Sequence, residues 1–233
     1  MKIKICGLFR EQDIDYVNEA RPDFCGFVFA PSKRQVSAEQ ADKLRQRLAE
    51  GIVPVGVFVN QSPEEVNVLY RNGIITIAQL HGDETEEYIA QLKATSGNTP
   101  IKVIQVVKLS SNNSVPPCLC ERLLKDINAD YYLLDSGAGS GKPFNWNLLY
   151  PPRPPTPDPR SLISDPHSPF PIPHSPIKNP WFLAGGISMD NIKQAVALDP
   201  FGIDVSSGAE TDGVKDREKI LQLTNIVRKG NSL

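Results

Sequence analysis

The sequence lacks the features that mark membrane proteins and nucleic-acid-binding proteins. Its 233 residues contain no apolar run of 18, the length that a membrane-spanning helix needs. Lys and Arg total 25 and Asp and Glu 27, and the formal net charge of −2 argues against a polyanion as the main partner. The opening residues, MKIKICGLF, contain neither an apolar signal region nor an Arg- and Ser-rich transit segment. We therefore expect a cytoplasmic protein with no membrane partner and no nucleic-acid partner.

Cysteine is scarce as well. The four cysteines, Cys6, Cys25, Cys118 and Cys120, form no C-x-x-C pair, so the sequence indicates neither a disulfide framework nor a zinc site. Cys118 and Cys120 lie two residues apart with no His-rich partner nearby, and we expect them to lie incidentally on a helix. No metal is expected.

Proline, in contrast, is abundant and unevenly placed. Twelve of the 21 prolines lie between Pro151 and Pro180. A stretch of this composition is more typical of a linker than of a folded element. Its position among the other elements decides whether it separates two domains or decorates one.

Eight short segments are rich in strand-forming residues, and each is followed by a helical pattern or by a loop where a helix could lie. The segments are nearly continuous in apolar residues, as expected for strands buried on both faces. Eight such units in this length predict an α/β protein with a (β/α)₈ barrel, whereas a doubly wound open sheet has fewer strands and a G-x-G-x-x-G turn after its first strand. The segments are Ile3–Cys6, Phe24–Phe29, Val53–Val59, Ile77–His81, Ile101–Val107, Tyr131–Asp135, Trp181–Ile187 and Gly202–Ser207.

Helices are predicted from apolar spacing and from capping residues that have Gln or Glu three positions later. We expect helices over Arg10–Ala20, Val115–Ile127 and Asp216–Arg228, and a short helical piece near Trp146–Tyr150. Ser37, Ser62 and Asp83 are each expected to cap a helix, and Ser188 to cap one that runs through Leu198.

The Pro-rich stretch falls between the sixth and seventh predicted strands. The two strands after it cannot form a domain alone, so they must complete the barrel that the first six begin. We therefore expect one domain over residues 1–233, in which residues 151–180 form a surface insertion that replaces or extends the sixth helix region.

Polar and reactive residues gather where the predicted strands end, which is the rim that carries the active site in barrels of this kind. Two neighbouring loops there are rich in Gly and Ser, a composition that suits phosphate binding by backbone N–H groups. Two tight turns with capping serines are the alternative. The rim residues are Cys6, Arg34, His81, Asp135, Gly185, Gly186, Ser206 and Ser207.

Three of these residues have a side chain that could transfer a proton. Cys6 is open to interpretation as a nucleophile, a general base or a small core residue. Asp135 is either a helix cap or rim hydrogen-bonding partner, or a general acid or base, and His81 could bind substrate, transfer a proton or cap the next helix. A substrate held between the first and sixth strands would meet a proton acceptor on one side and a donor on the other, which favours an isomerase.

Together, the motifs resemble those of the phosphoribosylanthranilate isomerase family. The resemblance covers nearly the whole chain apart from roughly Pro151–Lys178. The motifs are KICG at Lys4–Gly7, GFVF and SKR within Gly26–Arg34, VGVFVN at Val55–Asn60, QLHGDE at Gln79–Glu84, LLD at Leu133–Asp135, GSGKPFNW at Gly139–Trp146, LAGGI at Leu183–Ile187 and DVSSGAE at Asp204–Glu210.

The resemblance implies the Amadori rearrangement of N-(5-phosphoribosyl)anthranilate to 1-(2-carboxyphenylamino)-1-deoxyribulose 5-phosphate in tryptophan biosynthesis. It implies general acid/base catalysis without a cofactor, a small phosphorylated substrate as the partner, and a monomer or homodimer. The family pattern makes Cys6 the general base and Asp135 the general acid. It places Arg34 at the anthranilate end and His81 in the site, and matches Gly185, Gly186, Ser206 and Ser207 to the phosphate loops.

Two departures from the family pattern and two other functions are weighed against this resemblance. The departures are the Pro-rich insertion and a loop with Pro143 and Asn145 where the family usually has Thr and Asp. Another phosphosugar enzyme, such as an aldolase, would need a Schiff-base lysine, for which Lys102 and Lys108 flank the fifth strand. A non-enzymatic scaffold would use residues 153–157, which resemble a polyproline ligand.

Overall fold

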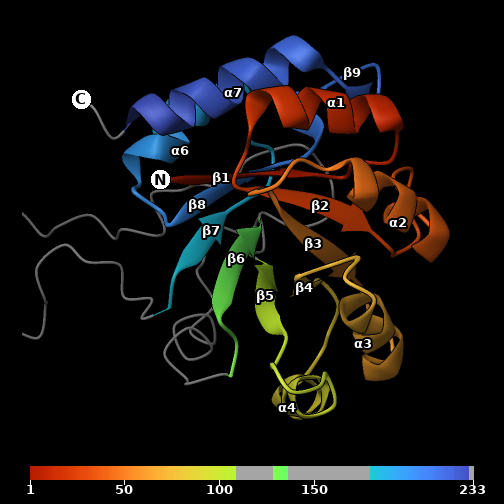
Figure 1. The fold of residues 1–233 in the computed structure, drawn as a ribbon. Helices are drawn as coiled ribbons and strands as arrows, with labels where there is room; N and C mark the ends of the chain where they lie inside the picture. The colour runs from red at the N-terminus through yellow and green to blue at the C-terminus, as the bar shows by residue number, and fades with distance from the viewer. Residues whose placement is uncertain (109–127, 136–178, 231–233) are drawn as a thin grey trace, which may run out of the picture.

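Eight parallel strands pair in sequence order and close into a barrel (Figure 1). This computed structural model describes residues 1–108, 128–135 and 179–230. Because β8 pairs with β1, the predicted (β/α)₈ barrel is confirmed and an open sheet is excluded. The strands are β1 Lys2–Cys6, β2 Phe24–Val28, β3 Val53–Phe58, β4 Ile77–Leu80, β5 Lys102–Lys108, β6 Tyr131–Asp135, β7 Trp181–Leu183 and β8 Gly202–Val205.

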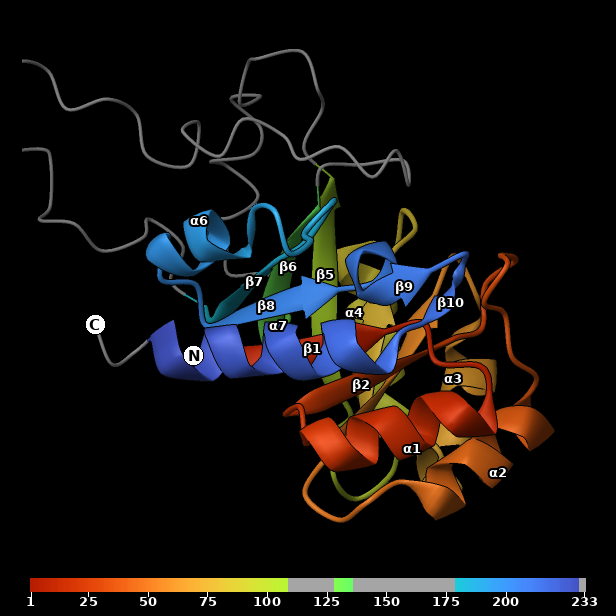
Figure 2. The same ribbon diagram turned by 90° about the horizontal axis from the view of Figure 1, so that it is seen from above.

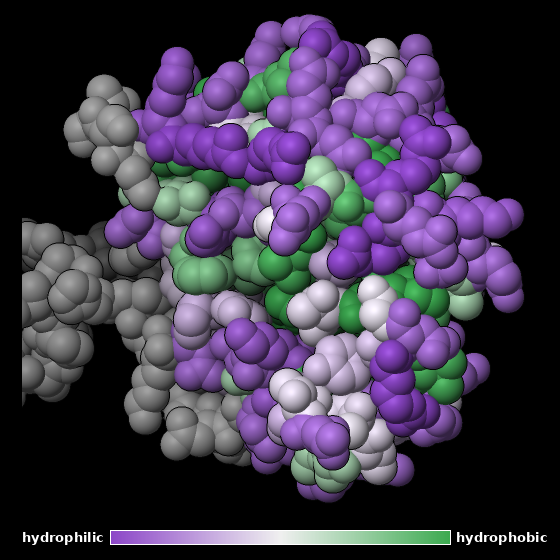
Figure 3. Space-filling model, in the orientation of Figure 1, coloured by the Kyte–Doolittle hydropathy of each residue, from purple (hydrophilic) through white to green (hydrophobic). Residues whose placement is uncertain are grey.

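Helices cover the outside of the strands (Figures 1 and 2). They are α1 Glu11–Ala20, α2 Ala38–Arg47, α3 Pro63–Arg71, α4 Glu86–Ala94, α6 Ile192–Ala197 and α7 Arg217–Lys229. None of the helices within the described ranges is long and apolar enough to cross a membrane. Hydrophilic residues cover much of the face in Figure 3, while hydrophobic residues show mainly near its middle.

Two of the predicted helix caps are confirmed and two are wrong. The hydroxyl of Ser37 accepts a hydrogen bond from the Gln40 backbone, and Ser62 forms a capping box with Glu65. The helix predicted to start at Asp83 is instead capped by Thr85. The backbone N–H of Asp83 donates to Asn60, which draws that residue into the preceding loop.

The second wrong cap is Ser188. The hydroxyl of Ser188 accepts a hydrogen bond from the Asp190 backbone within a turn, and α6 begins after Asn191. The side chain of Asn191 bonds instead to the loop before it, accepting from the Ser188 backbone N–H and donating to the Gly186 carbonyl. A short turn therefore separates β7 from its helix.

An unpredicted hairpin follows β8. After the short helix η3 (Ser207–Ala209), β9 (Glu210–Thr211) pairs antiparallel with β10 (Val214–Lys215). The turn residues Asp212 and Gly213 have positive φ of 53° and 80°, which suits the tight Asp-Gly turn of a hairpin.

Some predictions lie outside the described residues. They are the helix over Val115–Ile127, the piece near Trp146–Tyr150, Cys118, Cys120, Pro143, Asn145 and the Pro-rich stretch up to residue 178. In the chain, that stretch lies between β6 and β7. Its assignment as a surface insertion in a single domain remains a prediction.

The barrel interior has an apolar layer and a polar layer. Near the strand starts, Phe24 and Phe201 pack edge-to-face on Phe182, with ring centroids 5.4 and 5.3 Å from it. Further along the strands, the buried side chains include Lys4 and Asp204. The apolar layer fills the interior, so the polar end of the barrel is where a site can form.

Candidate active site

A cavity of about 470 Å³ lies at the end of the barrel where the strands finish. All eight residues that the sequence predicted line it: Cys6, Arg34, His81, Asp135, Gly185, Gly186, Ser206 and Ser207. Lys102 and Lys108, the lysines that an aldolase would need, are exposed and do not belong to its lining. The cavity therefore brings together residues from six strand ends or the loops that follow them, and neither Lys102 nor Lys108 lines it as a Schiff-base lysine would.

Cys6 is the last residue of β1, and its side chain is buried at the cavity floor. Gly26 lies directly beside it in the β1–β2 register. A Cβ atom at position 26 would lie 2.7 Å from the Cys6 sulfur, so the thiol occupies the space that a side chain on β2 would need. Burial raises the pKa of the Cys6 thiol, and the charge of Lys4 acts against that rise.

A buried ion pair connects β1 and β8 close to Cys6. Lys4, fully buried, donates to both carboxylate oxygens of Asp204 at 3.0 Å, across the register of β1 and β8. Burial alone would lower the pKa of Lys4. The charge of Asp204, joined by Cys6, outweighs burial and raises the pKa of Lys4 to about 12.

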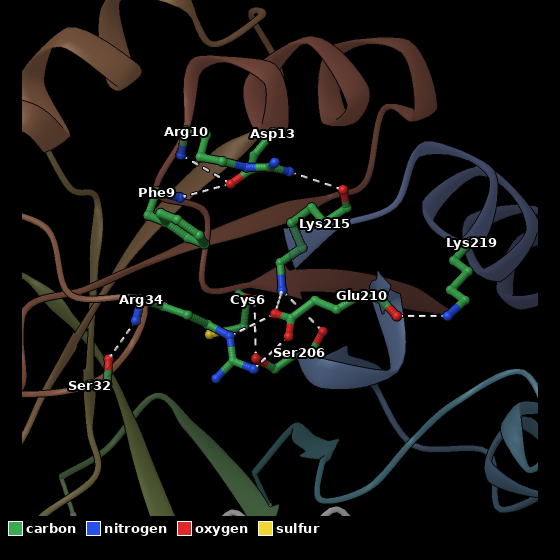
Figure 4. A network of polar contacts seen from close by, with 10 residues as sticks. All are labelled: Cys6, Phe9, Arg10, Asp13, Ser32, Arg34, Ser206, Glu210, Lys215 and Lys219. Atoms are coloured by element: carbon green, nitrogen blue, oxygen red, sulfur yellow. Dashed lines mark hydrogen bonds and ion pairs between the residues drawn. The ribbon is translucent and has the colours of Figure 1, made fainter. Parts of the chain in front are cut away.

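Arg34 is held by the hairpin that follows β8 (Figure 4). Its Nε and Nη2 donate to the two carboxylate oxygens of Glu210 at 2.6 and 2.7 Å. Lys215 donates to the same carboxylate at 2.5 Å and to the Ser206 carbonyl at 3.0 Å. The Ser206 hydroxyl in turn donates to the Cys6 carbonyl at 3.2 Å. One polar network therefore connects Arg34, a Ser-rich loop and the end of β1.

The charges in this network support one another. The Glu210 bond raises the pKa of Arg34. Burial favours the neutral form of Glu210, but hydrogen bonds from Arg34 and Lys215 hold the pKa of Glu210 below its ordinary value. Burial lowers the pKa of Lys215, and Glu210 opposes that change.

His81 lies just after β4 and faces the end of β6. Its Nε2 lies 3.4 Å from a carboxylate oxygen of Asp135, and its Nδ1 lies 3.5 Å from the amide nitrogen of Gln79. An amide donor at Nδ1 favours the tautomer that carries its proton on Nε2, facing Asp135. The buried Oε1 of Gln79 has no partner within the described part of the chain, so this cavity-lining acceptor is available to a substrate hydroxyl.

The two Gly- and Ser-rich loops pack against each other. Gly185 and Gly186 have φ of 86° and 65°, a conformation that glycine adopts without strain. A Cβ atom on Gly208 would collide with the Ile187 carbonyl oxygen of the neighbouring loop. The loop after β7 therefore requires glycine for its backbone conformation, and the loop after β8 requires glycine for the close approach of the two loops.

Sequence reasoning missed four charged residues and one amide beside the cavity. The sequence did not assign the charged residues to the site, although three of them lie in the KICG and DVSSGAE motifs and the fourth follows closely. They are Lys4, Asp204, Glu210 and Lys215. The Asp-Gly dipeptide at 212–213 was the available signal for the hairpin that carries Glu210 and Lys215. Gln79 shares the β4 end with His81 and has the same orientation, because strand residues two apart face the same side.

Comparison with known proteins decides the family. The family model described as N-(5'phosphoribosyl)anthranilate (PRA) isomerase matches residues 3–154 and 171–225. The chain belongs to this family. An N-(5'-phosphoribosyl)anthranilate isomerase from Clostridium acetobutylicum is 39% identical over 235 residues, with 98% of each chain covered.

Solved structures of phosphoribosylanthranilate isomerases share the fold of this family member. The enzyme from Thermus thermophilus has a TM-score of 0.76 and 29% identity, covering 98% of this chain and 99% of its own. Another isomerase, with a TM-score of 0.74, 28% identity and 98% coverage of each chain, was solved with reduced 1-(o-carboxyphenylamino)-1-deoxyribulose 5-phosphate. Both neighbours are phosphoribosylanthranilate isomerases that share this fold over nearly their whole length.

Proposed function

We propose that this chain converts N-(5-phosphoribosyl)anthranilate to 1-(2-carboxyphenylamino)-1-deoxyribulose 5-phosphate by general acid/base catalysis, as part of tryptophan biosynthesis. The observation that carries the proposal is the placement of Cys6 and Asp135 on two separate strand ends of one cavity, together with two glycine-containing loops. The cavity also fits in size, because about 470 Å³ is within the range of small-molecule sites.

The reaction needs two proton movements, and the cavity offers one group for each. Asp135 as the general acid donates a proton to the ribose ring oxygen, so that the C1–O bond breaks and the nitrogen lone pair forms a C1=N iminium. Cys6 as the thiolate base then removes the proton on C2, which gives an enolamine that tautomerises to the ketone. Only protons move between substrate and enzyme, so the steps balance without an oxidant, a reductant or a cofactor.

The phosphate end of the substrate is assigned to the loops after β7 and β8. Gly185 and Gly186 have no side chain to block the approach of an anion to their backbone, and Ser206 and Ser207 add hydroxyl groups. The hydrogen bond from Ser206 to the Cys6 carbonyl ties this loop to the base. Binding of the phosphate would therefore fix the distance between the sugar and Cys6.

The anthranilate end is assigned to Arg34 and His81. The bonds from Arg34 to Glu210 use Nε and Nη2, which leaves Nη1 outside that pair. A guanidinium N–H is a suitable donor to a carboxylate. His81, which presents Nε2 toward Asp135, is assigned to orienting the acid as well as contacting the substrate.

The assignment is tested by following the loss of substrate fluorescence with purified protein. We expect Cys6→Ser and Asp135→Asn each to lower kcat by about 10²- to 10⁴-fold, the usual contribution of a positioned acid or base. Cys25→Ser is the matched control, because Cys25 is buried on β2 but does not line the cavity. Near-normal kcat in either of the first two variants contradicts the role given to that residue.

We also propose that the enzyme works in the cytoplasm as a monomer or homodimer. A reducing compartment keeps Cys6 a free thiol, which proton abstraction requires. Cell fractionation tests the compartment, and analytical ultracentrifugation distinguishes the two assembly states; recovery in an oxidising compartment or as a larger oligomer would contradict this.

A further inference from the structure

Lys4 is an unusual residue for its location. It has no exposed surface, although it lies in a barrel strand between Ile3 and Ile5. Lysine is almost never fully buried unless it is paired, because an ammonium group loses its hydration inside a protein. The pairing with Asp204 explains how the charge is tolerated, but it does not explain why a charge is there at all.

The orientation of the Lys4 side chain explains why a charge is placed there. Lys4 and Cys6 are two residues apart on β1, so their side chains lie on the same face of the strand. An ammonium group has three N–H donors. Two donors reach the two oxygens of Asp204, which leaves the third N–H outside that pair. The charges of Lys4 and Cys6 also act on each other, so the third donor is available to the thiol on the same face of the strand.

Other charged or titratable groups also lie near Cys6. Arg34 and Lys215 both bond to Glu210, and its carboxylate offsets their charge at the thiol. The groups whose charges interact with Cys6 are Lys4 on its own strand, Asp204 on β8, Lys215 on β10, Arg34 after β2, and Cys25, which points to the opposite face of β2.

We propose that Lys4 is a positioning residue for the base, whose third N–H donor holds the Cys6 sulfur and stabilises the thiolate while Asp204 keeps Lys4 protonated inside the barrel. The proposal rests on the proposed role of Cys6 as the base. Lys4 does not belong to the lining of the cavity, so it acts through Cys6 and not on the substrate.

The sign of the effect follows from the charges. Lys4 lowers the pKa of Cys6 against the larger effect of burial, and Asp204 raises it by less than Lys4 lowers it. Neutralising the whole pair should therefore move deprotonation of Cys6 to higher pH. The variant enzyme would then lose kcat at neutral pH and regain it as the pH rises.

The test compares wild type with Lys4→Met/Asp204→Asn, which leaves no unpaired buried charge. Alkylation by iodoacetamide is followed against pH by mass spectrometry of the peptide that carries Cys6. We expect its midpoint to rise by about one pH unit, the lower end of the effect of one opposite charge, because the loss of Asp204 offsets part of the loss of Lys4. The kcat profile should move with it.

The matched control is Lys2→Met/Asp23→Asn. This removes an ion pair of the same kind, 2.7 Å long, at the other end of β1, where half of the Lys2 side chain is exposed. Its alkylation midpoint should not move. Should the first double variant fail to fold, Lys4→Gln/Asp204→Asn provides two amides that can bond to each other, with the same expected shift.

A folded double variant whose alkylation midpoint equals that of wild type overturns the proposal. So does an equal shift in the control. Because alkylation needs no catalysis, this result is separate from the proposed function: activity retained by Cys6→Ser would remove the role of Cys6 as the base, whereas the alkylation midpoint would still report the effect of Lys4.

Discussion

At the scale of single residues, the site depends on a missing side chain as much as on those present. Gly26 leaves the space that the Cys6 thiol fills, and a Cβ atom there would lie 2.7 Å from the sulfur and 3.1 Å from the Cys6 Cα. We expect Gly26→Ala to displace Cys6 and to lower kcat about 10- to 100-fold, because misplacing a reacting group by about 1 Å has that effect. Stability should fall by about 1–3 kcal/mol through overpacking.

Steady-state kinetics and urea unfolding of Gly26→Ala check both effects. Gly202→Ala is the control, since a Cβ there would crowd the Phe182 ring at 2.5 Å, within the apolar layer. It should lose similar stability without a comparable loss of kcat per folded molecule. Equal kcat losses in the two variants would show that general overpacking, and not displacement of Cys6, is responsible.

At the scale of elements, the β9–β10 hairpin acts as a clamp on Arg34. It brings Glu210 and Lys215 together, and Glu210 holds the guanidinium by two bonds. We expect Glu210→Gln to raise KM about 10- to 100-fold with a smaller change in kcat, since losing a charge-assisted bond costs about 1.5–3 kcal/mol and affects ground state and transition state alike. Glu19→Gln, which disrupts the exposed pair with Arg217, should leave KM unchanged.

The elements also show what sequence patterns can and cannot predict. Strands buried on both faces stand out as continuous apolar runs, so all eight were predicted. Several of their ends were set too far along the chain, by one residue at Val59 and by four at Ile187, because loop residues at the rim are apolar too. The wrong caps at Asp83 and Ser188 arise because several neighbouring residues can cap a helix, and loop contacts decide which one does.

Other features of the site depend on contacts between distant parts of the chain. Lys4 and Asp204 are 200 residues apart, and only the closure of the ring places them side by side. A lysine in an apolar strand could equally have faced solvent at an edge. The pair could be recognised only once strand order and register were known.

At the scale of the whole molecule, the Lys4–Asp204 pair joins the first barrel strand, β1, to the last one, β8, where the ring closes. We expect Lys4→Met alone to lower the free energy of unfolding by about 3–5 kcal/mol, because it leaves the Asp204 carboxylate buried without its partner. Adding Asp204→Asn should restore most of that loss, since no buried charge is then left. Lys2→Met, at the half-exposed pair, should change stability little. Urea unfolding of the three variants measures these differences, and a single variant Lys4→Met as stable as wild type would show that the barrel closes without help from this pair.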